Sequence, residues 1–135
     1  MPGEPATVQE WGIAGGGQYK AVGVGAGITG QGGHIAIIDD PVKDWAEALS
    51  QTRRDTVWDW YRSTLYTRLA PGGGMLVMAT RWHHDDLTGR LLTAMEAGDG
   101  DTFDLLEFPA EAPDEPAAYD WRQPGEALHP ERFPV

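Results

Sequence analysis

Two continuous apolar runs limit most tightly how this chain can fold. Residues 35–38 read IAII and residues 75–79 read MLVMA, and neither run alternates with polar residues. A strand without alternation carries apolar side chains on both faces, which is typical of a central parallel strand covered on both sides. The runs therefore predict an α/β fold in which two neighbouring strands are parallel and are joined by a right-handed crossover.

Helical periodicity follows each of these predicted strands. Within residues 45–69, apolar side chains recur at spacings of three and four, and Ser50 is placed to cap a second helix inside this stretch. After the second run, Asp85 or Asp86 is expected to cap a helix over roughly residues 86–97. The order strand, helix, strand, helix agrees with the predicted α/β layers.

The remaining segments are less regular. Residues 1–18 are rich in Gly and Pro and are expected to be an irregular lead-in, whereas residues 19–25 alternate loosely enough to form a strand. Residues 103–108 are predicted to be the last strand. Residues 109–135 are dense in Pro, Glu and Asp, so we expect an irregular tail or linker there and a core within residues 19–108.

Composition narrows the class of protein. Among the 135 residues, 41% are hydrophobic and six are tryptophan, which indicates one folded domain. A net charge of −11 argues against a free-standing nucleic-acid binder. A local basic face remains possible, because a cluster of arginines falls on the predicted helix, where they could reach DNA or a neighbouring subunit or simply be solvated: Arg53, Arg54, Arg62 and Arg68. The chain has no cysteine, no apolar run long enough for a membrane span and no signal-peptide pattern, which favours an intracellular protein.

Polar pairs follow both predicted strands directly. Asp39 and Asp40 come after the first run, and Thr80 and Arg81 come after the second. Ligands of parallel sheets collect beyond the carboxyl ends of the strands, where both pairs are expected to lie. One carboxylate could hold Mg²⁺ and the other could orient or activate a water for phosphoryl transfer. Alternatively, the two acids simply begin an ordinary loop before Pro41.

Three longer motifs carry a resemblance to a known family. They are IAIIDDP at 35–41, WDWYRSTLYTRL at 58–69 and ATRWHHDDLTGRL at 79–91. Together they resemble the ATPase domain of the large terminase subunit of tailed bacteriophages, the DNA-packaging motor. The resemblance covers roughly residues 20–134 and corresponds to the C-terminal half of that ATPase domain.

The resemblance implies a fold and a set of site residues. The fold would be an incomplete P-loop NTPase of the additional-strand class, with three layers and a mainly parallel sheet; full-length members also carry an RNase H-like nuclease domain. Asp39 matches the Walker B aspartate that binds Mg²⁺, and Asp40 matches the neighbouring catalytic carboxylate, which is commonly the longer glutamate in terminases. Thr80 matches the coupling motif that senses the γ-phosphate or its attacking water. Arg81 would contact the nucleotide or pair with a carboxylate such as Asp39 or Asp40.

The resemblance also implies cofactors and partners. In a complete motor these would be ATP and Mg²⁺, double-stranded DNA, the portal protein and the small terminase subunit, in a ring oligomer in the cytoplasm of the bacterial host. The P-loop pattern GxxxxGK[ST] does not occur in the sequence, and the glycines within residues 23–33 lack its Lys-Ser/Thr ending. We therefore expect that glycine segment to be a connector, and the isolated chain to show little or no ATPase activity.

Two other functions are compatible with the residues. The first is a small metal-dependent hydrolase built from Asp39, Asp40, His83, His84 and Asp86, although helix capping by the acids is the better interpretation of the HHDD sequence. The second is a non-catalytic module that docks on an intact motor or a capsid component. Metal binding without nucleotide would favour the hydrolase, and co-purification with a P-loop-bearing partner would favour the module.

Overall fold

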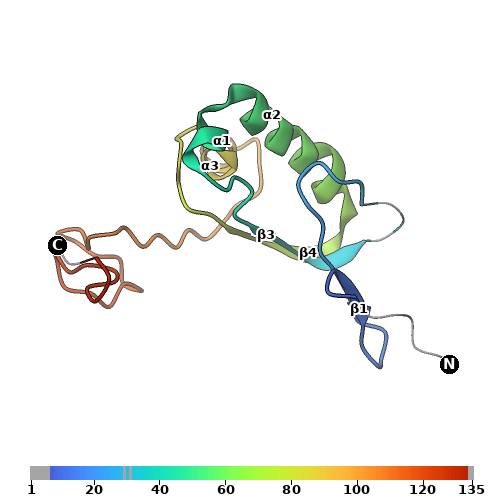
Figure 1. Cartoon of the computed structure of the whole chain (residues 1–135), viewed down its shortest axis with the longest axis horizontal. Helices are drawn as coiled ribbons and strands as arrows, with labels where there is room; N and C mark the ends of the chain where they lie inside the picture. Colours follow the sequence, from blue (N-terminus) through green and yellow to red (C-terminus); the bar gives the residue numbers. More distant parts are fainter. Residues whose placement is uncertain (1–6, 29, 31, 134–135) are drawn as a thin grey trace. The chain divides into compact units, whose positions relative to one another are not determined.

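The structure is a computed structural model that describes residues 7–28, 30 and 32–133 (Figure 1). It divides the chain into two compact units, residues 1–100 and residues 101–135. The first unit contains all the helices and strands among the described residues. The second unit is built mainly from turns and irregular backbone.

A pair of parallel strands forms the centre of the first unit. β3 (Gly33–Asp39) and β4 (Leu69–Met78) contain the two apolar runs and pair in parallel, with Asp39 opposite Met78. This confirms the predicted parallel pair and gives a mixed α/β fold. β4 begins earlier than the run at 75–79 because it also includes the PGGG segment, and the register shifts near the start of the pair, between Gly33 and Ile35.

The helices begin at the residues that the sequence marks as caps. α1 (Trp45–Leu49) follows Asp44, and α2 (Gln51–Trp60) follows Ser50, whose hydroxyl accepts a hydrogen bond from the amide of Arg53 at 3.3 Å. α2 continues as a π-helical turn, η1 (Tyr61–Leu65), and a 3₁₀ turn, η2 (Tyr66–Arg68), before β4. The predicted cap at Ser50 is therefore confirmed.

The last helix, α3 (Leu87–Ala97), is capped at both ends. The carboxylate of Asp86 accepts a hydrogen bond from the amide of Gly89 at 2.8 Å, as an N-cap acid should. Gly98 ends the helix with a φ of 73°, a left-handed conformation that glycine adopts without steric cost. The predicted helix and its cap by Asp86 are both confirmed.

Only one face of the β3–β4 pair is covered by the described residues. Ile38 is buried, whereas Ile35 and Ile37 on the opposite face are 74% and 58% exposed. Leu76 and Met78 of β4 are exposed on the same face as these isoleucines. In Figure 1, α1, α2 and α3 lie on one side of the strands. The expectation that the strands are covered on both faces is therefore wrong for this chain.

Two further expectations about strands are wrong. Residues 1–18 are expected to be irregular, and residues 1–6 of this stretch lie outside the described residues; within the rest, β1 (Glu10–Gly12) pairs antiparallel with β2 (Gln18–Lys20), and the Trp11 and Tyr19 rings stack at 5.1 Å. Strands of three residues are too short for a clear alternation, so the sequence pattern does not reveal them. Residues 103–108 form no strand, because they have no ladder partner among the described residues.

The second unit is held together by a buried ion pair. Arg122 and Asp120 are 5% and 8% exposed, and their side chains are joined by hydrogen bonds of 2.8 and 2.9 Å. The Arg122 guanidinium also donates to the carbonyls of Pro109 and Glu126. A single arginine thus satisfies the backbone of several irregular segments.

No helix in the described part of the chain is long and apolar enough to cross a membrane.

The covered and open faces of the first unit differ in how a truncation should affect stability. Val57 of α2 is 1% exposed, so Val57→Ala should lower the free energy of unfolding by about 2 kcal/mol. Ile35→Ala, which removes more carbon from the open face, should change it by less than about 0.5 kcal/mol. Urea unfolding followed by tryptophan fluorescence measures both. Equal losses for the two variants would show that the β3 face is covered in solution.

Candidate functional site

The ends of β3 and β4 meet where the polar pairs were predicted. The amide of Asp40 donates to the carbonyl of Met78 at 3.0 Å, which extends the strand pairing by one residue. The Asp40 side chain then crosses to the neighbouring strand, where its Oδ1 accepts the amide proton of Thr80 at 3.0 Å. The structure thus brings together two of the predicted site residues that are forty positions apart in the sequence.

Asp40 has an unusual backbone conformation. Its φ is 40°, and among the described residues no other non-glycine residue has a positive φ. Aspartate tolerates this left-handed region better than most residues, because its short side chain can hydrogen-bond to nearby backbone groups. The chain therefore turns sharply at the end of β3, with the carboxylate joined to the end of β4.

Asp39 differs from Asp40 in its surroundings. As the last residue of β3 it lies on the open face with Ile35 and Ile37, by the alternation of the strand, and it is exposed. Asp40 is exposed as well. The two carboxylates thus stand at the carboxyl end of the sheet with solvent access, Asp39 at the edge of the open face and Asp40 against the next strand.

Arg81 does not pair with either of these acids. Its Nε donates to Oδ2 of Asp86 at 2.8 Å, and its Nη2 donates more weakly to the carbonyl of His84 at 3.4 Å. Arg81 thus pairs with a carboxylate, as one of the two expectations had it, but the partner is Asp86 and not Asp39 or Asp40, while contact with a nucleotide stays a prediction. The reason is local: Arg81 and Asp86 flank the same tight turn, so their pairing costs less chain ordering than a pairing across strands.

The HHDD segment is a structural turn. The Nδ1 of His83 accepts the amide proton of Asp85 at 3.0 Å, and the rings of His83 and His84 stack at 4.3 Å. Burial, followed by the neighbouring Arg54 guanidinium, lowers the pKa of His83 below its ordinary value of 6.5, which agrees with a neutral ring that accepts a hydrogen bond. Within the described ranges no three His, Asp or Glu residues form a group that could hold a metal ion. This geometry gives no support to the alternative hydrolase.

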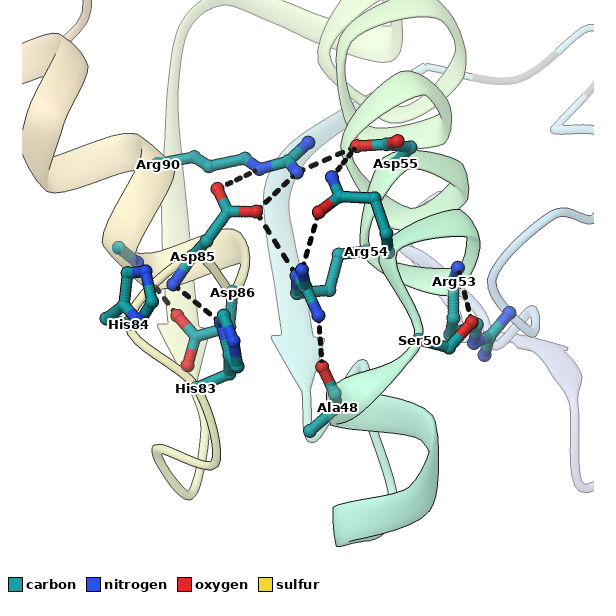
Figure 2. A network of polar contacts seen from close by, with 12 residues as sticks. Ala48, Ser50, Arg53, Arg54, Asp55, His83, His84, Asp85, Asp86 and Arg90 are labelled. Carbon is teal, nitrogen blue, oxygen red and sulfur yellow. Dashed lines mark hydrogen bonds and ion pairs between the residues drawn. The ribbon is translucent and has the colours of Figure 1, made fainter.

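A polar network that the sequence analysis missed holds this turn against α2 (Figure 2). Oδ2 of Asp85 accepts from Nε of Arg54 at 3.1 Å and from Nη2 of Arg90 at 2.8 Å, while Oδ1 accepts from Nε of Arg90 at 2.8 Å. Arg54 also donates to the carbonyl of Ala48 at 2.6 Å, and Arg90 donates to Asp55 at 2.8 Å. These bonds join α1, α2, the turn and α3.

Arg54 is only 7% exposed, so it is neither a solvated nor a DNA-facing arginine. The sequence did contain a signal for this burial. Arg54 lies three positions before Val57 and seven before Tyr61, both of which are buried, so it falls on the buried stripe of the helix. A charged residue on such a stripe needs an opposite charge nearby, and Asp85 provides it.

The glycine-rich segment lies away from the site. It precedes β3, so it leads into the amino end of the strand, whereas Asp39 ends the strand. The indole N–H of Trp60 donates to the carbonyl of Ala26 at 2.9 Å and fixes this segment to α2. A phosphate-binding loop follows a strand and precedes a helix, which is not the arrangement here. Residues 29 and 31 of this predicted connector lie outside the described residues.

Comparison with known proteins identifies the family. Residues 10–133 match the family described as terminase large subunit, T4-like virus type, N-terminal. The chain belongs to this terminase family. The match includes the strand ends, the HHDD turn and α2, and no curated protein or solved structure gives a significant match.

Two substitutions in this terminase chain separate the effect of the Asp40–Thr80 hydrogen bond on stability from the effect of the Asp40 charge. Asp40→Asn keeps an acceptor oxygen and a residue that tolerates positive φ, so its free energy of unfolding should stay within about 0.5 kcal/mol of the native value. Asp40→Ala loses the bond and strains the backbone, which should cost about 1–2 kcal/mol. Urea unfolding measures both, with Asp59→Ala on the exposed side of α2 as the control. An Asp40→Ala variant as stable as the control would contradict the bond.

The polar network should make this terminase chain sensitive to acid. Hydrogen bonds from Arg90 and then Arg54 hold the pKa of the Asp85 carboxyl below its ordinary value of 3.8. Its ionised form therefore stabilises the fold fully above that value, and the contribution is lost as the pH falls from there through the lowered pKa. At pH 7, Asp85→Asn should be less stable by about 1–2 kcal/mol, a value limited by the partial exposure of the carboxylate.

Urea unfolding at pH 7 and at about pH 3 tests this dependence. The difference between the native chain and Asp85→Asn should narrow in acid. The pKa of Asp120 in the second unit is also lowered, by its hydrogen bond from Arg122, so the readout is the difference between the two proteins rather than the native curve alone. A difference that stays constant would show that the Asp85 carboxyl titrates alike in the folded and unfolded chains.

Proposed function

We propose that this chain is the part of a phage DNA-packaging ATPase that carries the Walker B acids and the coupling segment. The observation that carries the proposal is the hydrogen bond between Asp40 and Thr80 at the adjacent carboxyl ends of two parallel strands. That edge is where ligands of open α/β sheets bind. The family match over residues 10–133 supports the terminase part of this proposal.

The donor set at this edge suits a magnesium–nucleotide complex. Asp39 and Asp40 offer carboxylate oxygens, and Mg²⁺ is usually held by one or two carboxylates, waters and substrate phosphates. When bound, Mg²⁺ would neutralise charge on the phosphates during phosphoryl transfer. Asp39, the freer of the two acids, would be its ligand.

Asp40 and Thr80 would act on the attacking water. One oxygen of Asp40 is fixed by the Thr80 amide, which leaves the other oxygen available to accept a proton or orient the water. Thr80 would contribute its hydroxyl toward the γ-phosphate while its amide holds Asp40. Any change at Thr80 on hydrolysis would then pass directly to the catalytic carboxylate. Arg81 would reach nucleotide only by exchanging its ion pair with Asp86.

The open face of the sheet supports the incomplete P-loop fold. Parallel strands are normally buried on both faces, yet Ile35, Ile37, Leu76 and Met78 are exposed. Further strands and helices of an ATPase core, including the P-loop, would cover them.

In the assembled motor the partners would be double-stranded DNA, the portal protein and the small subunit, in the host cytoplasm. The chain alone would have little ATPase activity, because its sequence lacks the phosphate-binding motif.

Titration with Mn²⁺ in the presence of ATP, followed by amide NMR, tests the proposed site. Paramagnetic broadening should appear first at the amides of Asp39, Asp40 and Thr80. Asp39→Asn should weaken Mn²⁺ binding about tenfold because it removes a charged ligand. Asp59→Asn serves as the matched control, since it removes the same charge from an exposed helix position.

The control distinguishes Mn²⁺ binding at a specific site from the general attraction of cations to an acidic protein. A net charge of −11 attracts cations everywhere, so equal weakening by Asp39→Asn and Asp59→Asn would contradict a site at the strand ends. Uniform broadening over the acidic surface would lead to the same conclusion. ATP hydrolysis by the purified chain at the rate of a complete motor would contradict the expectation that the isolated chain is inactive.

A further inference from the structure

In the loop after β4, the neighbours of Thr80 make most of the contacts, because Arg81 binds Asp86 and His83 accepts from the amide of Asp85. The amide of Thr80 donates to Asp40, and residues 79–83 form neither helix nor strand. Thr80 itself is exposed. Its position must therefore be set by what lies beneath and beyond it along the chain.

The start of α3 lies beneath this loop. A small cavity of about 10 Å³, enough for one water molecule at most, is lined from three sides, by Pro41 after β3, Thr80 and Trp82 after β4, and Asp86 and Leu87 at the start of α3. Asp86 and Leu87 are 7% and 3% exposed. Both strand-end loops thus rest on the first residues of α3, so a shift of this helix would move the Thr80 loop relative to Asp40.

The start of α3 is in turn fixed to α2 by Asp85. Figure 2 shows the carboxylate between the two guanidinium groups, with Arg54 approaching from α2 and Arg90 from α3. Arg54 is buried and also holds the carbonyl of Ala48 at the end of α1. Arg54, which donates to the Asp85 carboxylate, is therefore a rigid donor that the first helices of the unit already orient.

We propose that Asp85 is a positioning residue for the proposed ATPase site: by binding Arg54 and Arg90 it fixes the start of α3 and so holds Thr80 at hydrogen-bond distance from Asp40. The inference rests on the proposed function for its consequence, because only a nucleotide site gives the position of Thr80 a chemical role. Asp85 touches neither Asp40 nor Thr80 in the contacts described above, so it acts through α3 rather than on a ligand.

Hydrogen exchange of the Thr80 amide in the whole chain tests the positioning directly. In Asp85→Asn, the exchange protection of this amide should fall about tenfold, because a neutral amide group cannot hold both guanidinium groups. The Mn²⁺ affinity measured with ATP should fall about threefold to tenfold in the same variant. The matched control is Asp55→Asn, which removes a partner of Arg90 at the more exposed end of the network and should change both values less than twofold.

Arg54→Lys provides a second variant that keeps the charge but loses the planar fork. In this variant, the exchange protection of the Thr80 amide should lie between that of the native chain and that of Asp85→Asn. Amides within α2 report whether either variant has unfolded; if Asp85→Asn unfolds, Arg54→Lys decides. Unchanged Thr80 protection in a folded variant would overturn the positioning role. If the native chain binds no Mn²⁺, the proposed function fails, whereas the exchange result still decides whether Asp85 fixes Thr80.

Discussion

The parallel register of β3 and β4 is the constraint on which the rest of this structure depends. Because Asp39 stands opposite Met78, the next residue of each strand leaves the sheet at the same level, and the Asp40 carboxylate can reach the Thr80 amide. A shift by one residue would turn Ile38 out of the core and Ile37 into it. The same pairing thus decides which apolar side chains are buried and which side chains meet at the sheet edge.

Much of this arrangement was predictable from local patterns. The unbroken apolar run ending at Ile38 predicted a parallel strand, and capping chemistry located the helix starts at Ser50 and Asp86. These features depend on neighbours within a few positions, so the sequence displays them directly. The approach of Asp40 to Thr80 followed from a topological rule, since parallel strands end at one edge of the sheet.

The features that were not predicted depend on contacts for which several partners are possible, and the sequence does not show which partner is used. Arg54 and Asp85 are 31 positions apart, and only the packing of α2 beside the turn brings them together. Arg81 could pair with acids that precede it in the sequence or with Asp86, which follows it. The geometry of the turn favours Asp86, the nearer of these in the sequence. The run at Ile35 predicted burial correctly for one face and wrongly for the other, because periodicity reports what a strand can bury and not what is present to cover it.

The identity of residue 40 follows from the turn as well as from the chemistry. In the resemblance described above, the position that matches residue 40 is commonly glutamate in other terminases. Here the residue has a φ of 40° and caps the amide of Thr80. Aspartate suits both demands better than glutamate, since it enters the left-handed region more readily and its carboxylate lies closer to the backbone. In the proposed ATPase site, the shorter acid would reach less far toward a water but would be held in a fixed position by the Thr80 amide, so the network proposed to position Thr80 would also position this carboxylate.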